Sequence, residues 1–197
     1  MTPAWIGWYT DPAACAAGNE PVRFLITPTG VVEYRTTPIG LFRVARPDIP
    51  RPAISASVPL TAGTEGVTFT IPRIPYDFLP TIVTECRRAL PHELLLEVRW
   101  DVRRQCFRIL IPHQQATATS VTTDALRDPY DPLFPRVVQI HSHGTLPAFF
   151  SATDDADEQA TGCYGVIGRC DQPRPDMVWR MSCGGRFVSL TVSNLFM

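Results

Sequence analysis

Apolar positions follow two different periods along the second half of the chain. Residues 77–90 carry apolar side chains at the three- and four-residue spacing of an amphipathic helix, and Pro91 ends it. The β-branched run 136–143 predicts a strand. Residues 152–160 follow a Ser-x-x-Asp capping signature and predict a second helix, with Gly162 as its stop. The pattern therefore favours an α/β sandwich in which helices flank a mixed sheet.

Shorter apolar runs predict further strands in both halves of the chain. Those expected before residue 72 are 22–26, 31–34, 41–44 and 67–71, the first two forming a hairpin. Those expected after it are 92–100, 107–111, 117–123, 164–167, 177–181 and 187–192. Prolines 72 and 75 punctuate the chain between the groups. We place a boundary there, between a β-rich region, 1–72, and a core, 73–197. The sequence does not indicate the role of the N-terminal region. A packing extension is the default interpretation, and partner docking is the alternative.

Side chains that can bind a metal cluster in one short segment. His141 and His143 face the same way on the predicted strand, and Ser142 faces the opposite way. Ser151 and Asp154 occupy the N-cap and the first turn of the predicted helix. Each feature alone has a plain structural interpretation, either a capping box or polar side chains on a solvated sheet. Together they suggest three ligands, which leave a tetrahedral Zn²⁺ one open position, as in catalytic sites.

The spacing His-x-His-x7-Ser-x2-Asp resembles that of the JAMM (MPN+, Mov34-type) zinc metalloproteases, without gap or insertion. The wider strings 140–158 and 165–180 are most similar to a prokaryotic JAB branch, that of protein A of the PRTRC gene system. The resemblance covers residues 73–197 well and the N-terminal part loosely. It implies an MPN/JAB-type α+β fold, a mixed sheet flanked by helices, behind a β-rich N-terminal extension.

The resemblance also implies a ligand set and a catalytic acid. One Zn²⁺ per chain would be held by His141, His143 and Asp154. The family uses an upstream glutamate near the end of the first core helix, where this chain offers Glu93. Glu97 lies on the same face of the following strand by the period of two and is the rival candidate. Glu93 is preferred, because in the family a proline or a small polar stretch comes just before the acid.

The implied reaction is zinc-dependent hydrolysis of an amide. The ion would lower the pKa of its water to roughly 7, and Glu93 would serve as general base and then general acid. Ser151 would donate a hydrogen bond to the oxyanion, a role typically worth about 10²–10³ in rate. The proline-rich loop 124–135 precedes the histidine strand. Its Tyr130 and Phe134 are candidate substrate-binding residues, because the loop can border an extended peptide.

The resemblance narrows the substrate to a peptide or isopeptide bond after the C-terminal tail of a ubiquitin-like protein. Such an isopeptidase would process a precursor or a conjugate, beside E1-like and E2-like partners. The alternative function is a non-catalytic MPN-type scaffold in a ubiquitin-like or plasmid-associated system. Retention of every ligand-type residue favours the enzyme.

Composition adds constraints on compartment and partners. The 18 basic and 19 acidic residues nearly balance, and no basic run predicts nucleic-acid binding. No apolar stretch reaches the length of a membrane span, and no secretory signal is recognisable, so we expect a cytoplasmic protein. The six cysteines are irregularly spaced without a Cys-x2-Cys pair, which argues against both a disulfide framework and a second zinc site. A cysteine protease receives little weight, because no cysteine has a supporting motif.

Overall fold

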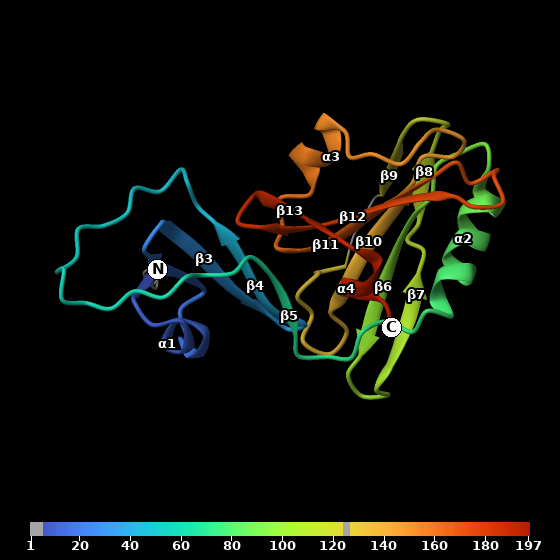
Figure 1. Cartoon of the computed structure of the whole chain (residues 1–197). Coiled ribbons are helices and arrows are strands. Elements are labelled where there is room, and N and C mark those ends of the chain that lie inside the picture. Colours follow the sequence, from blue (N-terminus) through green and yellow to red (C-terminus); the bar gives the residue numbers. More distant parts are fainter. Residues whose placement is uncertain (1–5, 124–126) are drawn as a thin grey trace.

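A six-stranded sheet forms the centre of the larger part of the molecule (Figure 1). The computed structural model describes residues 6–123 and 127–197. The strand order is β13-β12-β11-β10-β6-β7. These strands are β6 (Leu95–Asp101), β7 (Cys106–Leu110), β10 (Arg136–Ser142), β11 (Gly162–Gly168), β12 (Asp176–Cys183) and β13 (Arg186–Leu190). Strands β10 and β11 pair in parallel and the other neighbours are antiparallel, which confirms the predicted mixed sheet.

The helix α2 (Phe78–Ala89) packs against one face of this sheet and closes the core. Its buried side chains Ile82 and Cys86 belong to the same hydrophobic cluster as Leu96 and Ile140. Because side chains alternate along a strand, the neighbours of Leu96 and Ile140 point to the opposite face. The helix therefore leaves that second face free to carry polar groups. The predicted helix over 77–90 is confirmed to within a residue at each end.

The second face carries a short helix and a β-hairpin. Helix α3 (Ala152–Asp157) ends earlier than expected, and Gly162 is the first residue of β11 and not a helix stop. The predicted strand 117–123 is wrong in its first half. A turn closed by a hydrogen bond from Thr117 N–H to Ser120 O (2.8 Å) joins β8 (Gln114–Ala116) to β9 (Val121–Thr123). The side-chain amide of Gln114 fastens this hairpin to both backbone groups of Leu95 (2.8 and 3.1 Å).

The N-terminal residues form a separate five-stranded sheet in the order β1-β2-β3-β4-β5. Its elements are β1 (Ile6–Tyr9), α1 (Pro12–Ala17), β2 (Val22–Thr27), β3 (Gly30–Thr37), β4 (Gly40–Ala45) and β5 (Gly66–Phe69). The predicted hairpin of β2 and β3 is confirmed, as are strands β4 and β5. Neither β1 nor α1 was predicted. Helix α1 is capped by the Asp11 carboxylate, which accepts the Ala14 N–H at 2.7 Å.

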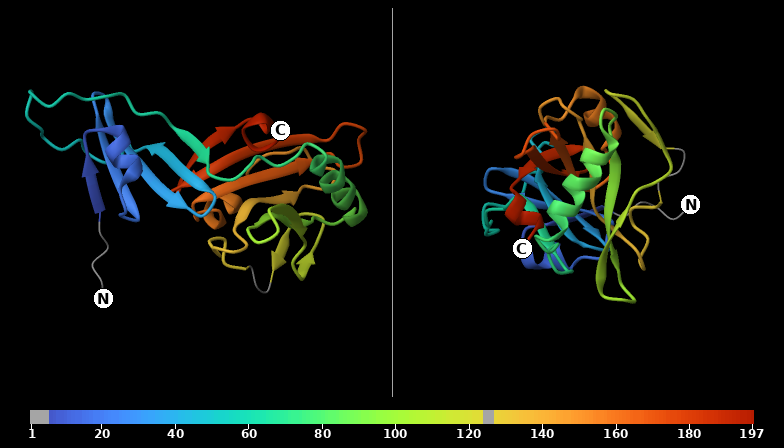
Figure 2. Two further views of the ribbon diagram at one scale, coloured as in Figure 1. Left: turned by 90° about the horizontal axis from the view of Figure 1, so that it is seen from below. Right: turned by 90° about the vertical axis from the view of Figure 1, so that its right-hand side faces the viewer.

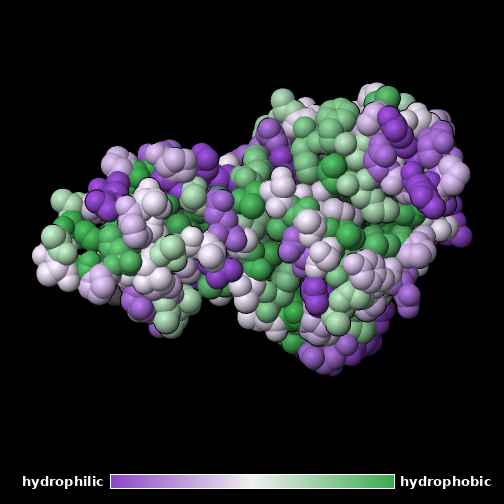
Figure 3. Space-filling model, viewed as in Figure 1, coloured by the Kyte–Doolittle hydropathy of each residue, from purple (hydrophilic) through white to green (hydrophobic). Residues whose placement is uncertain are grey.

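The two sheets form a smaller and a larger lobe with a constriction between them (Figures 2 and 3). The smaller lobe has a cluster of its own around Cys15, Leu25 and Tyr34. Strand β4 nevertheless contributes Phe42 and Val44 to the main cluster of the larger lobe. The boundary proposed near residue 72 falls between β5 and α2, and the division into two units stays a prediction.

The chain ends against the start of the core. Helix α4 (Val192–Leu195), which was not predicted, places Phe196 beside Ile74 in an isolated parallel bridge. Both of these side chains are completely buried. Among the helices of the described residues, none combines the length and the apolar character that crossing a bilayer requires.

Candidate metal centre

The end of strand β10 presents two histidines on the face opposite α2: His141 lies within the strand and His143 directly follows its last residue. His141 pairs with Leu95 on β6 and with Val166 on β11, so it occupies the middle of the sheet. Both His141 and His143 are buried. Burial lowers the pKa of His141 to about 4. This imidazole is therefore neutral at pH 7, which is the form that binds a metal.

The donor atoms of three residues lie at the separations that a metal ion requires. The Nε2 atoms of His141 and His143 are 3.2 Å apart, and His141 Nε2 is 3.4 Å from Asp154 Oδ1. All three donor atoms lie within 4.8 Å of one another. In a tetrahedral zinc site with bonds of 2.0–2.1 Å, neighbouring ligand atoms stand about 3.3 Å apart. The residues present therefore fit a zinc ion, with one coordination position left over.

The cap of α3 determines which oxygen of Asp154 is free. Asp154 Oδ2 accepts hydrogen bonds from the Ser151 N–H (2.6 Å) and the Ser151 hydroxyl (2.7 Å). The Asp154 N–H in turn donates to Ser151 Oγ, which completes the capping box that the sequence predicts. These bonds leave Asp154 Oδ1 facing His141. The cap thus fixes both the helix terminus and the orientation of the carboxylate.

The second histidine is fixed by the loop that follows β10. His143 Nδ1 lies 3.1 Å from the Pro147 carbonyl oxygen. A carbonyl only accepts, so Nδ1 carries the proton and Nε2 keeps its lone pair for a metal. The exposed Phe149 ring meets the His143 ring edge to face at 4.7 Å between centroids. The neighbouring Phe150 stacks instead on the Arg180 guanidinium.

Close backbone packing holds this loop in place. The N–H groups of Arg169 and Cys170 donate to the carbonyl oxygens of Leu146 (2.7 Å) and Gly144 (2.8 Å). A Cβ at Gly168 would lie 2.2 Å from the Ala148 backbone nitrogen. The loop approaches the end of β11 so closely that only glycine fits there.

Glu93 lies at the start of β6, beside the two histidines. Its backbone N–H donates to Thr117 O in the hairpin (2.7 Å), and the next N–H, that of Leu94, donates to Ser142 Oγ (2.9 Å). Ser142, predicted to face away from the two histidines, is a buried link between β10 and the segment that carries Glu93. Among the described residues, the Glu93 carboxyl group has no hydrogen-bond or ion-pair partner. Burial, together with the charge of Asp154, raises its pKa to about 7.

The rival glutamate is occupied elsewhere. Glu97 on β6 pairs with Gln139 on β10, two residues before His141 on that strand. Its Oε2 accepts from Arg99 Nε at 2.6 Å, and its Oε1 lies 3.6 Å from Arg136. Both carboxylate oxygens of Glu97 thus face guanidinium groups and not the histidines. This arrangement favours Glu93 over Glu97 as the acid–base group.

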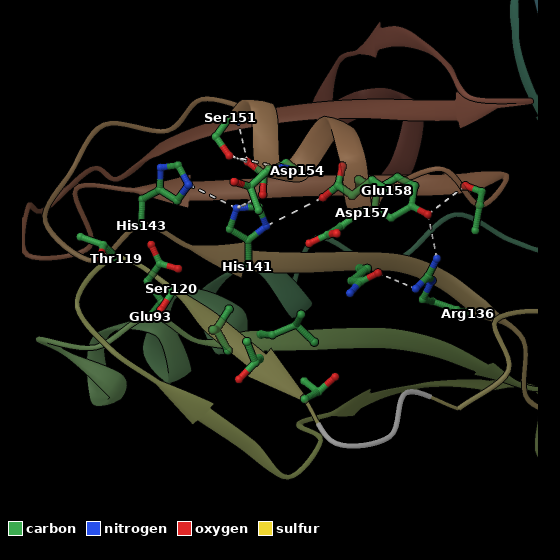
Figure 4. A pocket seen from close by; sticks show the side chains of 18 of the residues that line it. Glu93, Thr119, Ser120, Arg136, His141, His143, Ser151, Asp154, Asp157 and Glu158 are labelled. Atoms are coloured by element: carbon green, nitrogen blue, oxygen red, sulfur yellow. Dashed lines mark hydrogen bonds and ion pairs between the residues drawn. The ribbon is translucent and has the colours of Figure 1, made fainter.

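These side chains open onto one large cavity of about 810 Å³ (Figure 4). Glu93, the three ligand-type residues and Ser151 line it, and residues 119–123 of the hairpin form an opposite wall. Tyr130 and Phe134 are not among its lining residues. The Tyr130 hydroxyl donates to Thr161 O (3.0 Å), and Phe134 packs beside the Arg99 guanidinium. Their role in substrate binding stays a prediction.

Two charged residues of the site were not predicted from the sequence. Glu158 Oε1 lies 3.9 Å from His141 Nδ1, and Arg180 on β12 holds the other oxygen of Glu158. Burial raises the pKa of Glu158 to about 7, against the opposing effect of Arg180. The spacing of Glu158 four residues after Asp154, one helical turn, was the available signal.

Comparison with known proteins identifies the family of this chain. Among solved structures, the solution structure of protein DSY2949 from Desulfitobacterium hafniense is similar with a TM-score of 0.46 and 16% identity. The match covers 63% of this chain and 90% of that one. No match was found among curated proteins. A family model described as prokaryotic homologs of the JAB domain matches residues 77–182, more than half of the 197 residues. The similarity to PRTRC protein A stays a prediction, but the chain belongs to the family of prokaryotic homologs of the JAB domain.

Proposed function

We propose that this protein is a zinc-dependent peptidase or isopeptidase that cleaves after the C-terminal tail of a ubiquitin-like protein. Membership of the JAB family supports the coarser choice between a metal-dependent hydrolase and a non-catalytic scaffold. The observation that carries the proposal is the spacing of the three donor atoms beside a buried glutamate that has no partner within residues 6–123 and 127–197. A scaffold has no use for a buried carboxyl group without a partner, since such a group costs stability.

The proposed catalytic roles follow from the groups that line the cavity. Zn²⁺, when held by His141, His143 and Asp154, lowers the pKa of a water molecule to about 7 and polarises a carbonyl. Glu93 accepts the proton of the attacking water and later returns it to the leaving amine. In the metal-free protein burial raises the pKa of Glu93 to about 7, close to the working pH at which a general acid–base group is most effective. The bound metal would bring that pKa down somewhat.

Ser151 is proposed to stabilise the oxyanion that develops on the substrate carbonyl. Its hydroxyl donates to Asp154 Oδ2 at 2.7 Å, so it must rotate toward the substrate to play this role. Asp154 Oδ2 still keeps the Ser151 N–H at 2.6 Å when the hydroxyl turns. The helix cap therefore survives the rotation, and the hydroxyl can serve both purposes.

The substrate class rests on the JAMM resemblance and on the shape of the cavity. A cavity of about 810 Å³ between the sheet and the β8–β9 hairpin has room for an extended peptide segment. Exposed Leu146 and Phe149 stand at its rim, where they can contact apolar parts of such a tail. A ubiquitin-like protein or its conjugate, supplied by E1-like and E2-like partners, is the proposed substrate.

The proposal is tested by zinc analysis and cleavage of a ubiquitin-like fusion. The protein would be purified, its zinc measured by mass spectrometry, and a ubiquitin-like protein of the same genome fused to a fluorescent protein used as substrate. We expect one zinc per chain and cleavage at the fusion junction. Glu93→Gln should keep the zinc and lose about 10²–10⁴ in rate, the usual contribution of a general acid–base group.

A matched variant controls for loss of charge. Glu85 is a half-buried glutamate of α2 whose carboxylate bonds Arg88, away from the cavity. Glu85→Gln should cleave at the wild-type rate. Equal cleavage by wild type and Glu93→Gln would remove Glu93 from the mechanism. A wild-type protein with neither zinc nor cleavage would favour the scaffold.

A further inference from the structure

The helix that carries Asp154 has no apolar anchor. None of the six residues of α3 is buried. Most helices in proteins are held by an apolar face packed against the core, and isolated helices this short do not form in water. The position of Asp154 must therefore be set by polar contacts at the two ends of α3. Ser151 supplies the contacts at the N-terminal end.

Arg180 supplies the contacts at the other end. This β12 residue is buried, and its guanidinium donates to Asp155 Oδ1 (2.5 Å) and to Glu158 Oε2 (2.9 Å from Nε). The rings of Phe150 and Phe187 stack on it, with centroids 3.9 and 3.8 Å from Cζ. A guanidinium clamped between two rings has little freedom to turn, so its N–H groups point in fixed directions.

The clamp determines how Glu158 faces the metal centre. Its Oε2 is engaged by Arg180, which leaves Oε1 directed at His141 Nδ1 at 3.9 Å (Figure 4). That distance is about 1 Å longer than the usual donor–acceptor distance of a hydrogen bond. The Glu158 N–H donates to Asp154 O (2.9 Å). One helical turn therefore joins the ligand Asp154 to Glu158, whose carboxylate lies behind the ligand His141.

We propose that Glu158, held by Arg180, is a positioning residue that orients the His141 ring through Nδ1 and presents its Nε2 to the metal. Metal-binding histidines commonly donate their second N–H to a carboxylate, which fixes the ring and the tautomer. His143 receives the same support from the Pro147 carbonyl. This inference rests on the metal centre of the proposed function, but not on any substrate.

Zinc affinity is the measurement that tests this role. The protein would be stripped of metal and titrated with Zn²⁺ against a chromogenic chelator at pH 8. We expect Glu158→Gln to bind zinc about 10–100-fold more weakly than wild type, the usual loss for such a partner. Asp157→Asn removes the same charge from the same helix at an exposed position that also lines the cavity, where Asp157 has no ion pair with a described residue. It should bind within about twofold of wild type, given that exposed charges contribute little.

Two further variants separate orientation from anchoring of the helix. Glu158→Asp keeps the charge but withdraws it from Nδ1 by one methylene, and should weaken zinc binding at least tenfold. Asp155→Asn weakens the hold of Arg180 on α3 without touching His141 and should have a smaller effect. The visible absorption spectrum of the Co²⁺-loaded proteins should change in intensity for the two Glu158 variants alone, because it reports ligand geometry.

The outcomes are distinct. Wild-type affinity in Glu158→Gln, or in Glu158→Asp if the first variant does not fold, would overturn the inference. Equal losses in Asp155→Asn or Asp157→Asn and in the Glu158 variants would also overturn it, since anchoring or net charge would then explain the effect. A wild-type protein that binds no zinc would overturn the metal centre itself. Zinc binding without cleavage would count against the proposed function only.

Discussion

Replacing Glu93 by glutamine should stabilise the metal-free protein at alkaline pH. Glu93 is 7% exposed as a residue, and among the described residues its carboxyl group has no partner. Its pKa is raised by burial, and further by Asp154, to about 7 from an ordinary value of 4.5. Below pH 4.5 the group is protonated in both states and costs nothing. As the pH rises from 4.5 to 7, the unfolded chain ionises first, so the free energy of unfolding falls; above 7 the penalty is constant.

The size of this penalty follows from the two pKa values. Their difference of 2.5, at 1.36 kcal/mol for each pKa unit, gives at most about 3 kcal/mol. Partial solvation of the carboxyl group reduces this, and we expect about 1–3 kcal/mol at pH 8. For a chain of this length each kcal/mol shifts Tm by roughly 2–4 °C. Glutamine has the same shape without the charge, so it removes the penalty and leaves packing unchanged.

The assay is thermal unfolding of wild type, Glu93→Gln and Glu85→Gln with a chelator present. Glu93→Gln should melt several degrees above wild type at pH 8, and most of this difference should disappear at pH 5. Glu85→Gln should follow wild type at both pH values, since the half-buried Glu85 carboxylate has an ion pair with the exposed Arg88, and such a pair contributes little. A Glu93→Gln variant that melts with wild type at pH 8, or whose advantage is the same at pH 5, would show that Glu93 is not a desolvated acid. The reasoning for its catalytic role would then lose its physical basis.

Three further predictions address the ligands, the cap and the loop. Zinc at 100 times its Kd should stabilise wild type by about 2.7 kcal/mol and His143→Ala hardly at all; equal shifts in Tm would place the metal elsewhere. Ser151→Ala should retain zinc, lose about 1 kcal/mol of stability with its helix cap and lose about 10²–10³ in kcat, whereas unchanged turnover would leave Ser151 only a cap. Gly168→Ala should cost about 1–3 kcal/mol in urea denaturation, because its Cβ would lie 2.2 Å from the Ala148 nitrogen; wild-type stability would mean that the loop does not pack so closely.

The parts of the site that depend on local rules could be predicted from the sequence. Strand alternation is enough to bring His141 and His143 to one face, and the capping signature is enough to place Ser151 and Asp154 at a helix start. The periodicity of residues 77–90 predicts where the first core helix ends, and the family resemblance then selects Glu93 just beyond it. In each case the determining interactions span a few residues, so neighbouring positions carry the information.

The parts that depend on contacts between distant segments could not be predicted. Strand β8 consists of Gln114, Gln115 and Ala116, which carry no strand signature; the Gln114 side chain holds it against Leu95. In the sequence, Glu158 is one of several acidic residues in a polar predicted helix, and nothing nearby distinguishes it from the others. Its importance depends on Arg180, which lies 22 residues later and meets it through the pairing of β11 with β12. No local pattern reports such a pairing.

The shared packing of strand β4 has a practical consequence for work on this protein. The family model begins at residue 77, and a shortened chain starting there would seem the natural choice for biochemistry. Such a chain would lack Phe42 and Val44, both fully buried in the main cluster. It would present to solvent an apolar surface that β4 covers in the intact protein, and surfaces of that kind promote aggregation. Enzymology on this protein is therefore best done with the N-terminal sheet left in place.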